Sequence, residues 1–352
     1  MHIAIRVDSS SQIGAGHVMR CLNLARCFRE HGHTIAFVCR DLPGNLIPFL
    51  KSLEFEVVTL HNQEPSSSQL LSSYESWIGV SWQQDAKQFC SYNLQVDIVI
   101  VDNYALDYKW QSQVQQHFNC KMVAIDDLKR RHVADVVIDQ TLNCTPAAYS
   151  DSDSSCILTG TRYAMLNPKL LNYRNTVTKS SLDGFLRVLI SFGASDEPNG
   201  TLRVLQTLVT ARINFQATVL LRPSAINYQL VKEFVNRYPK FIKHFDHIDN
   251  MAEIMIEHDV AIGAAGSSCW ERACIGLPSI IVPIADNQRD ICDALVLENI
   301  AIQIKLEQIE DKLPFAVSEL IEKYDDLKFN GLKICDAKGV ERIYNKVMEA
   351  IG

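Results

Sequence analysis

A glycine-rich turn with a histidine follows the first apolar run of the chain. The segment "RVDSSSQIGAGHVMRCLNLA" spans residues 6–25, and in it Gly14 and Gly16 precede His17. Glycine accepts positive φ and lets a ligand approach the backbone closely, and a following helix would offer free N–H groups to an anion. An imidazole at this point can act as a base, as a ligand or as a plain hydrogen-bonding group. Met19 occupies the third glycine position of G-x-G-x-x-G, so the dinucleotide fingerprint is incomplete.

Charged and aromatic residues follow two of the apolar runs. Asp8 and Arg20 flank the glycine turn and are candidates for substrate contacts, although an ion pair that holds the loop explains Arg20 at least as well. In "IVIVDNYALD", Asp102, Asn103 and Tyr104 follow an apolar stretch. A carboxylate and a phenol at a strand end suit hydrogen bonds to a sugar hydroxyl or a water. The alternative is an aspartate that caps a helix beside a packed tyrosine.

Two further loops carry weaker signals. The run "AIDDL" contains Asp126 and Asp127, and we expect at least one of them to cap a helix. The run "LISFGASDEPNGTL" brings Gly193 and Ser195 into a turn that could contact phosphate. A plain strand-to-helix turn capped by Asp196 is the simpler explanation of that run.

The most informative run is "DVAIGAAGSSCWERACIGLPSIIVPIADNQRD". An apolar strand there ends in a glycine/serine loop formed by Gly266, Ser267 and Ser268. The helix that follows would leave N–H groups free to hold a diphosphate. Glu271, one turn into that helix, could accept hydrogen bonds from both hydroxyls of a ribose, although acids are common in a first helical turn because of the helix dipole. Asn287 and Gln288 stand at the exit of the next strand.

Short β-branched runs alternate with longer amphipathic ones along the whole chain. The predicted strands are 2–7, 35–39, 56–60, 97–101, 122–125, 136–139, 156–159, 187–192, 217–221, 241–245, 260–263, 279–283 and 301–304. Most of them are continuously apolar, which indicates strands buried on both faces. The pattern predicts an α/β protein with two doubly wound, Rossmann-like domains. Ligands of such sheets bind beyond the carboxyl ends of the strands, so we expect the two domains to face each other across a cleft.

Polar stretches mark the domain boundaries. We predict a first domain over 1–172 with the histidine loop and a second domain over 183–334 that binds the nucleotide. Residues 335–352 are predicted to form a helix that packs back on the first domain.

Composition excludes several classes of function. The 352-residue chain has a net charge of −7 and no dense Lys/Arg block, which argues against nucleic-acid binding. No apolar run reaches ~18 residues, so we expect no membrane span, and no signal-peptide pattern is evident. The 11 cysteines form no C-x-x-C pair, which favours free thiols in a reducing cytoplasm. We also expect no metal and no cofactor, and the sequence leaves the oligomeric state open.

The glycine/serine run resembles the nucleotide-binding segment of GT-B proteins, among them the lipid-II-forming N-acetylglucosaminyltransferase and UDP-sugar epimerases. The first run, together with "VDNYALD", "AIDDL", "RYAMLNP" and "ISFGASD", is similar to the UDP-2,4-diacetamido-2,4,6-trideoxy-β-L-altropyranose hydrolase family of pseudaminic acid (nonulosonate) biosynthesis. The resemblance covers about the first 300 residues. Two departures are Ala194, where that family has glycine, and Asn167, where it has arginine.

The resemblance implies a GT-B-like, metal-independent hydrolase whose substrate is a UDP-sugar of surface polysaccharide synthesis. Water would attack C1 of the sugar, the C–O bond would break with inversion, and UDP would leave. His17 would be the general base, Tyr104 would lie near it or the substrate, and Asn287 would contact the sugar. Glu271 would bind ribose. A positioned base typically contributes ~10²–10⁴-fold to a rate.

Other functions remain open at this point. A GT-B glycosyltransferase is the main alternative, because the UDP-binding half alone does not distinguish it, and a UDP-sugar epimerase is a further one. A non-catalytic nucleotide-sugar binding module would bind UDP without turnover. A redox enzyme fits least, since the dinucleotide fingerprint is incomplete.

Overall fold

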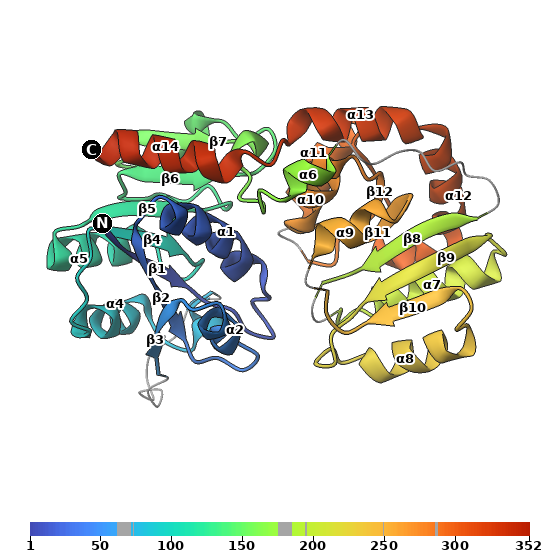
Figure 1. Ribbon diagram of the computed structural model, residues 1–352, viewed down its shortest axis with the longest axis horizontal. Helices are drawn as coiled ribbons and strands as arrows, with labels where there is room; N and C mark the ends of the chain where they lie inside the picture. Colours follow the sequence, from blue (N-terminus) through green and yellow to red (C-terminus); the bar gives the residue numbers. More distant parts are fainter. Residues whose placement is uncertain (62–71, 73, 175–184, 194–195, 249, 286–287) are drawn as a thin grey trace. The chain divides into compact units, whose positions relative to one another are not determined.

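The computed structural model shows two compact α/β units (Figure 1). It describes the chain except for residues 62–71, 73, 175–184, 194–195, 249 and 286–287. Unit 1 comprises Met1–Met165 together with Lys338–Gly352, and unit 2 comprises Leu166–Ala337. The predicted end of the first domain at 172 is therefore too late. The reason is that the short helix α6 (Leu170–Tyr173) contacts helices α9 and α10 of unit 2.

Unit 1 is built on a seven-stranded sheet with the order β3-β2-β1-β4-β5-β6-β7, in which every pair of neighbours is parallel. Its strands are β1 (His2–Val7), β2 (Thr34–Arg40), β3 (Glu56–Leu60), β4 (Ile98–Asp102), β5 (Lys121–Ile125), β6 (Val136–Asp139) and β7 (Cys156–Thr159). The strand order reverses between β1 and β4. The crevice at such a reversal is where doubly wound sheets bind their ligands.

The helices of unit 1 bury their apolar faces on this sheet. They are α1 (Gly16–Glu30), α2 (Ile47–Ser52), α3 (Glu75–Ile78), α4 (Trp82–Ser91), α5 (Tyr108–Phe118) and α14 (Gly339–Ile351). Helix α1 buries Val18, Leu22 and Phe28 at helical spacing. Helix α14, the last element of the chain, packs against α1, and its buried residues are Val340, Ile343 and Val347.

Unit 2 has a six-stranded sheet with the order β10-β9-β8-β11-β12-β13, again parallel throughout. Its strands are β8 (Leu186–Ser191), β9 (Phe215–Leu220), β10 (Ile242–Phe245), β11 (Val260–Ala264), β12 (Ser279–Val282) and β13 (Ala301–Gln303). The order reverses between β8 and β11. These two strands lie so close that a Cβ added at Gly263 would stand 1.8 Å from the carbonyl oxygen of Ser191.

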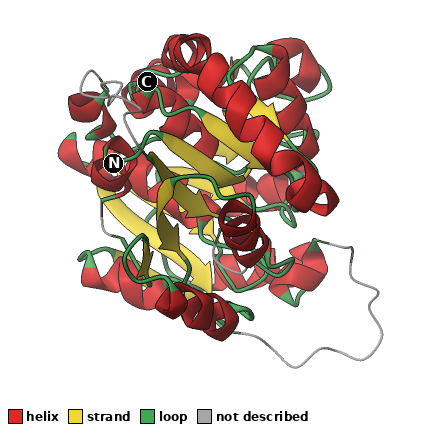
Figure 2. Ribbon diagram, turned by 90° about the vertical axis from the view of Figure 1, so that its right-hand side faces the viewer, coloured by secondary structure: helices red, strands yellow, loops and turns green. Residues whose placement is uncertain are grey.

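Helices lie on both sides of the strands (Figure 2). Those of unit 2 are α6, α7 (Gly200–Thr210), α8 (Tyr228–Arg237), α9 (Met251–Ile256), α10 (Ser268–Ile275), α11 (Arg289–Leu297), α12 (Ile309–Glu322) and α13 (Tyr324–Ile334). The thirteen strands of the two sheets all correspond to predicted ones, with bounds that differ by at most two residues. The prediction of two doubly wound α/β domains is thus confirmed.

Candidate active site

His17 is the second residue of α1, at the carboxyl end of β1 and beside the strand reversal of unit 1. Its Nδ1 lies 2.7 Å from Oδ1 of Asp102, the last residue of β4. The His17 side chain is 12% exposed, whereas the Asp102 side chain is fully buried. Nη2 of Arg20, which only donates, also lies 3.2 Å from Nδ1. The shorter contact is with the carboxylate, which only accepts, so we assign the hydrogen to Nδ1 and the lone pair to Nε2.

Arg20 holds the same carboxylate from the other side. Its Nε donates to Oδ2 of Asp102 at 2.7 Å, and its Nη2 donates to Oδ1 at 2.6 Å. Its Nη1 donates to Oδ2 of Asp127 at 3.0 Å. Burial alone would raise the pKa of Asp102, but the charge of Arg20 and the hydrogen bonds from Arg20 and His17 hold it well below its usual range. Asp102 is therefore an ionised acceptor, and Arg20 is part of the ion pair that the sequence offered as its alternative role.

Aromatic rings surround the histidine. The ring of Tyr104 meets that of His17 edge to face, with 4.7 Å between centroids. Tyr74 and Trp77 from the α3 region pack on Tyr104 at 5.3 and 6.3 Å. Burial, and then the charge of Asp127, raise the pKa of the Tyr104 phenol far above its ordinary value. The hydroxyl thus stays protonated and can donate a hydrogen bond, but it does not act as a base.

These residues line a small pocket whose cavity volume of about 10 Å³ is roughly that needed for one water molecule. Its walls are Asp8, Ile13, His17, Tyr74, Trp77, Ile78, Asp102, Asn103, Tyr104 and Ala105. Apolar and aromatic surface here surrounds a few convergent polar groups. The fold thus brings three predicted site residues, Asp8, His17 and Tyr104, together in one pocket.

The predicted substrate contact Asp8 is buried and bound within the protein. Its Oδ1 accepts from Nη1 of Arg6 and from the backbone N–H of Arg40, both at 2.6 Å, and its Oδ2 accepts from Asn103 at 2.8 Å. Arg6 and Arg40 both also donate to the buried carboxylate of Asp85. Asp8 thus holds Asn103, the neighbour of Tyr104, in place.

The glycine turn before α1 also has the conformation that its sequence predicted. Gly14 has a φ of 80°, which favours glycine, and its N–H donates to the carbonyl of Ser10 at 2.9 Å. Gly16 is the first residue of α1. The turn positions His17 at the start of the helix.

In unit 2, the loop after β8 contains Gly193, with a φ of 90°. Asp196 accepts from the backbone N–H groups of Gly200 and Thr201 at 2.8 and 2.9 Å. It therefore caps the N-terminus of α7, the role that the sequence suggested for it. Ser195 lies outside the described residues, as does Ala194.

The glycine/serine loop connects β11 to α10. Ser267 occupies the N-cap of α10 and makes no side-chain capping bond, and Ser268 is the first residue of the helix. The N–H groups of Cys269 and Trp270 donate to the carbonyls of Gly266 and Ser267 at 2.9 and 3.1 Å. The N–H groups that precede them have no intrahelical acceptor. A Cβ added at Gly266 would meet no atom of the described residues within 4 Å. The loop thus leaves open space in front of a helix N-terminus.

Glu271 lies in the first turn of α10. Burial raises its pKa to about 7, and the charge of Arg272 offsets part of that effect. Gln288 is the N-cap of α11, and its Oε1 accepts from the backbone N–H of Ile284 at 3.0 Å. Asn287, predicted to contact the sugar, lies outside the described residues.

Two site residues were not identified as such from the sequence. Asp102 was recognised as a carboxylate at a strand end but not as the partner of His17, and Asp127 was considered only as one of two possible helix caps with Asp126. Both depend on the strand order β1-β4-β5, which sequence spacing does not reveal. The signal that was available is that Asp102 ends a buried apolar run and Asp127 comes two residues after one.

Comparison with solved structures identifies the architecture. The chain resembles MurG of Acinetobacter baumannii (TM-score 0.63, 14% identity, 99% of each chain covered) and the calicheamicin glycosyltransferase CalG4 (TM-score 0.66, 12% identity, 100% of this chain and 98% of that one). The fold is therefore that of GT-B glycosyltransferases. The model of the glycosyltransferase family 28 C-terminal domain matches residues 191–341.

Three sequence relatives narrow the class. An uncharacterized protein of Methanocaldococcus jannaschii is 23% identical over 83% of this chain and 58% of its own length. The UDP-2,4-diacetamido-2,4,6-trideoxy-β-L-altropyranose hydrolase of Campylobacter jejuni is 23% identical over 76% of this chain and 86% of its own. The spore coat polysaccharide biosynthesis protein SpsG of Bacillus subtilis is 20% identical over 97% and 96%. Thus the chain spans little more than half of the archaeal relative but most of the other two. The chain thus has a GT-B fold and is similar in sequence to a protein named as a UDP-sugar hydrolase.

None of the helices in the described part of the chain combines the length and apolar character needed to cross a membrane.

Proposed function

We propose that the chain is a hydrolase that releases UDP from UDP-2,4-diacetamido-2,4,6-trideoxy-β-L-altropyranose. The observation that carries the proposal is the contact of His17 with Asp102 at 2.7 Å, because it leaves Nε2 as a base on the wall of a pocket. The Campylobacter relative, which bears the name of this activity and is covered over 86% of its length, supports the choice of substrate.

In the proposed reaction, Nε2 of His17 takes a proton from a water as the water oxygen attacks C1 of the sugar. The bond from C1 to the diphosphate oxygen breaks, its electron pair leaves with UDP, and the configuration at C1 inverts. Asp102 stabilises the imidazolium that forms, as a buried acceptor does in other histidine-based sites. Tyr104, beside His17, is assigned a hydrogen bond to the water or the sugar.

In this proposal, unit 2 binds the UDP part of the substrate. The free N–H groups at Gly266, Ser267 and Ser268 stabilise the charge of the departing diphosphate, so the proposed reaction requires no metal. Glu271 accepts from the ribose hydroxyls. Asn287 and Gln288 are assigned to the sugar, and Gly193 and Ser195 to the phosphates, on the family resemblance.

The names of the sequence relatives suggest the biosynthetic pathway to which the proposed reaction belongs. The Bacillus relative is named for spore coat polysaccharide synthesis, which supports a role in building surface polysaccharides. The free sugar would then feed pseudaminic acid formation. All eleven cysteines are free thiols, which favours a cytoplasmic location.

A UDP-sugar glycosyltransferase is the second candidate. The family 28 match over 191–341 and the GT-B structures favour it. In that case the pocket beside His17 would hold the hydroxyl of an acceptor in place of water.

The deciding experiment incubates the protein with the UDP-sugar and EDTA, without acceptor, in ¹⁸O-water, and follows UDP release by NMR. The hydrolase is supported if UDP appears, if ¹⁸O enters the sugar, and if the His17→Leu variant releases none. Label in UDP would mean attack at phosphorus and would overturn the mechanism. Binding of UDP without release would favour the transferase or a binding module.

A further inference from the structure

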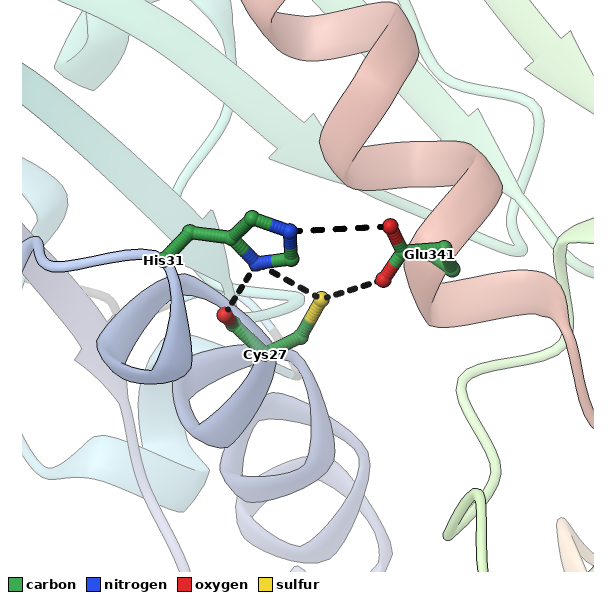
Figure 3. Close-up of side chains that lie close together, drawn as sticks. All are labelled: Cys27, His31 and Glu341. Atoms are coloured by element: carbon green, nitrogen blue, oxygen red, sulfur yellow. Dashed lines mark hydrogen bonds and ion pairs between the residues drawn. The ribbon is translucent and has the colours of Figure 1, made fainter.

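A second cluster of reactive side chains lies in unit 1, where α1 meets α14 (Figure 3). Cys27 and His31 are one turn apart at the carboxyl end of α1, and Glu341 is in the first turn of α14. The Sγ of Cys27 lies 3.4 Å from Oε2 of Glu341, and Nε2 of His31 lies 3.6 Å from Oε1. One potential ligand atom from each residue lies within 4.8 Å of the other two.

Hydrogen bonding orients the imidazole for coordination. The Nδ1 of His31 lies 2.9 Å from the carbonyl oxygen of Cys27, which only accepts, so Nδ1 carries the hydrogen. Nε2 then has a lone pair that points toward Glu341. The ring stacks on Tyr344 with 3.8 Å between centroids and an angle of 22°, which limits its rotation. Histidines that bind metals commonly donate their other ring N–H to a backbone carbonyl in this way.

The cluster combines a buried and an open side. Cys27 is 4% exposed, whereas the side chains of His31 and Glu341 are 36% and 54% exposed. A cation bound among the three would thus keep a coordination position for water. The carboxyl end of α1 adds the negative end of a helix dipole, which favours a cation.

We propose that Cys27, His31 and Glu341 bind a zinc ion that joins the end of α1 to the start of α14. One sulfur, one nitrogen and one oxygen donor form a ligand set that suits Zn²⁺, whereas the thiolate disfavours Mg²⁺ and Ca²⁺. Atoms bound to one tetrahedral zinc at about 2.0–2.3 Å lie roughly 3.3–3.8 Å apart. The distances from Sγ to Oε2 and from Nε2 to Oε1 of Glu341 are of this size. Because they involve the two oxygens of one exposed carboxylate, a rotation of that side chain would bring a single oxygen near both other ligands.

Binding includes a proton transfer. Burial, and then the hydrogen bond with Glu341, raise the pKa of the Cys27 thiol to about 12, so the free site holds a protonated thiol. When zinc binds, the S–H bond breaks, the sulfur electron pair forms the Zn–S bond, and the proton goes to the buffer. The alternative is an ion pair between His31 and Glu341 beside a thiol, with no metal.

The test uses the full chain, stripped with EDTA, desalted, and kept reduced with a phosphine. Titration with Co²⁺ is expected to give a thiolate charge-transfer band that saturates at one equivalent and disappears when Zn²⁺ is added. Zinc at about 100 times its Kd should raise the Tm by at least about 5 °C. We expect Cys27→Ser to lose the band, and His31→Gln and Glu341→Gln to bind at least about tenfold more weakly.

Two matched controls separate this site from other thiols and carboxylates. Cys156 is a half-buried thiol of unit 1 whose pKa responds to α14 residues, and Glu349 is an exposed acid of α14 paired with Lys346. Cys156→Ser and Glu349→Gln should keep the band and the Tm shift. The proposal is overturned if the unmodified protein shows no band, or if the band survives in Cys27→Ser. If Cys27→Ser fails to fold, the surface variant His31→Gln decides the question alone.

Discussion

Nδ1 of His17 lies 2.7 Å from Oδ1 of Asp102, although the two residues are 85 positions apart in the sequence. One follows β1 and the other ends β4, and these strands pair in parallel with Val7 opposite Asp102. The contact therefore depends on the strand order of the sheet. It also determines which ring nitrogen of His17 is free to take a proton.

Replacing Asp102 by asparagine should lower kcat for UDP release by roughly 10²–10⁴-fold with little change in KM. An amide neither requires Nδ1 to carry the hydrogen nor stabilises the imidazolium. Steady-state assays of UDP release measure both constants. Asp41→Asn is the control, because Asp41 is an exposed aspartate of the same unit. A wild-type kcat for Asp102→Asn would contradict the assigned role of the pair.

Tyr104→Phe tests the phenol separately from the ring. The variant keeps the ring contact with His17, so we expect kcat/KM to fall only about 2–12-fold, the value of one hydrogen bond. Tyr104→Ala should lose much more, because the imidazole then loses its neighbour. Since the pKa of Tyr104 is raised far above its ordinary value, the wild-type pH profile should show no loss of activity near pH 10 from this group. Equal losses in both variants would assign the whole effect to the hydroxyl.

The sequence predicted the strands well because most of them are buried on both faces. Ile98–Asp102, for example, has no exposed residue, and such a continuous apolar run is typical of a parallel sheet. The short helix α6 was harder to assign. Its four residues have no strong periodicity, and its place in unit 2 depends on contacts with α9 and α10.

The parts of the candidate site whose conformation is set by a few consecutive residues could be predicted from the sequence. The glycine turn before His17 and the N-cap at Ser267 are properties of a few consecutive residues. The partner of His17 was not predictable in this way. The environment of Asp8 illustrates the same limit, since its carboxylate is taken up by Arg6, Arg40 and Asn103 from three different strands or loops.

Replacing either of two glycines near the end of β11 by alanine should affect different properties: UDP affinity at Gly266 and stability at Gly263. Gly266→Ala adds a methyl group into open space, so the free energy of unfolding should change by less than about 0.5 kcal/mol. UDP affinity should nevertheless fall about tenfold or more if phosphate approaches the backbone there. Gly263→Ala would force a Cβ against the carbonyl of Ser191 and should cost roughly 2–4 kcal/mol.

Urea unfolding and calorimetric titration with UDP measure the two effects. Unchanged UDP affinity in a stable Gly266→Ala protein would remove the loop from the proposed phosphate site.

Replacing Asp85 tests how much the buried ion pairs near the pocket contribute to stability. It accepts from Arg6, Arg40 and Trp110, and all four side chains are buried. Asp85→Ala would leave two buried guanidinium groups short of a partner and should lower the free energy of unfolding by about 3–5 kcal/mol.

The stabilisation by Asp85 should also depend on pH. Burial would raise the pKa of Asp85, but the charges and hydrogen bonds of Arg6 and Arg40 lower it. Its contribution is therefore present above its unfolded pKa of about 3.9 and is lost as the pH falls below that value. Urea unfolding at pH 7 and pH 3 should show the difference between wild type and variant shrinking in acid, and an equal difference at both would contradict the assignment.

Glu271 should make UDP binding pH-dependent. Burial raises its pKa to about 7 from an ordinary 4.5, so without ligand it is mostly protonated below neutrality. Ribose hydroxyls that donate to its carboxylate would favour the ionised form, so binding should release a proton at pH 6. The affinity for UDP should then rise about tenfold from pH 6 to pH 8, since at pH 6 about one molecule in ten has the ionised carboxylate. Calorimetry in buffers of different ionisation enthalpy measures both the affinity and the proton release. Glu271→Gln serves as the control because it retains the titration of UDP itself, and a wild-type pH dependence in that variant would show that Glu271 does not bind the ribose.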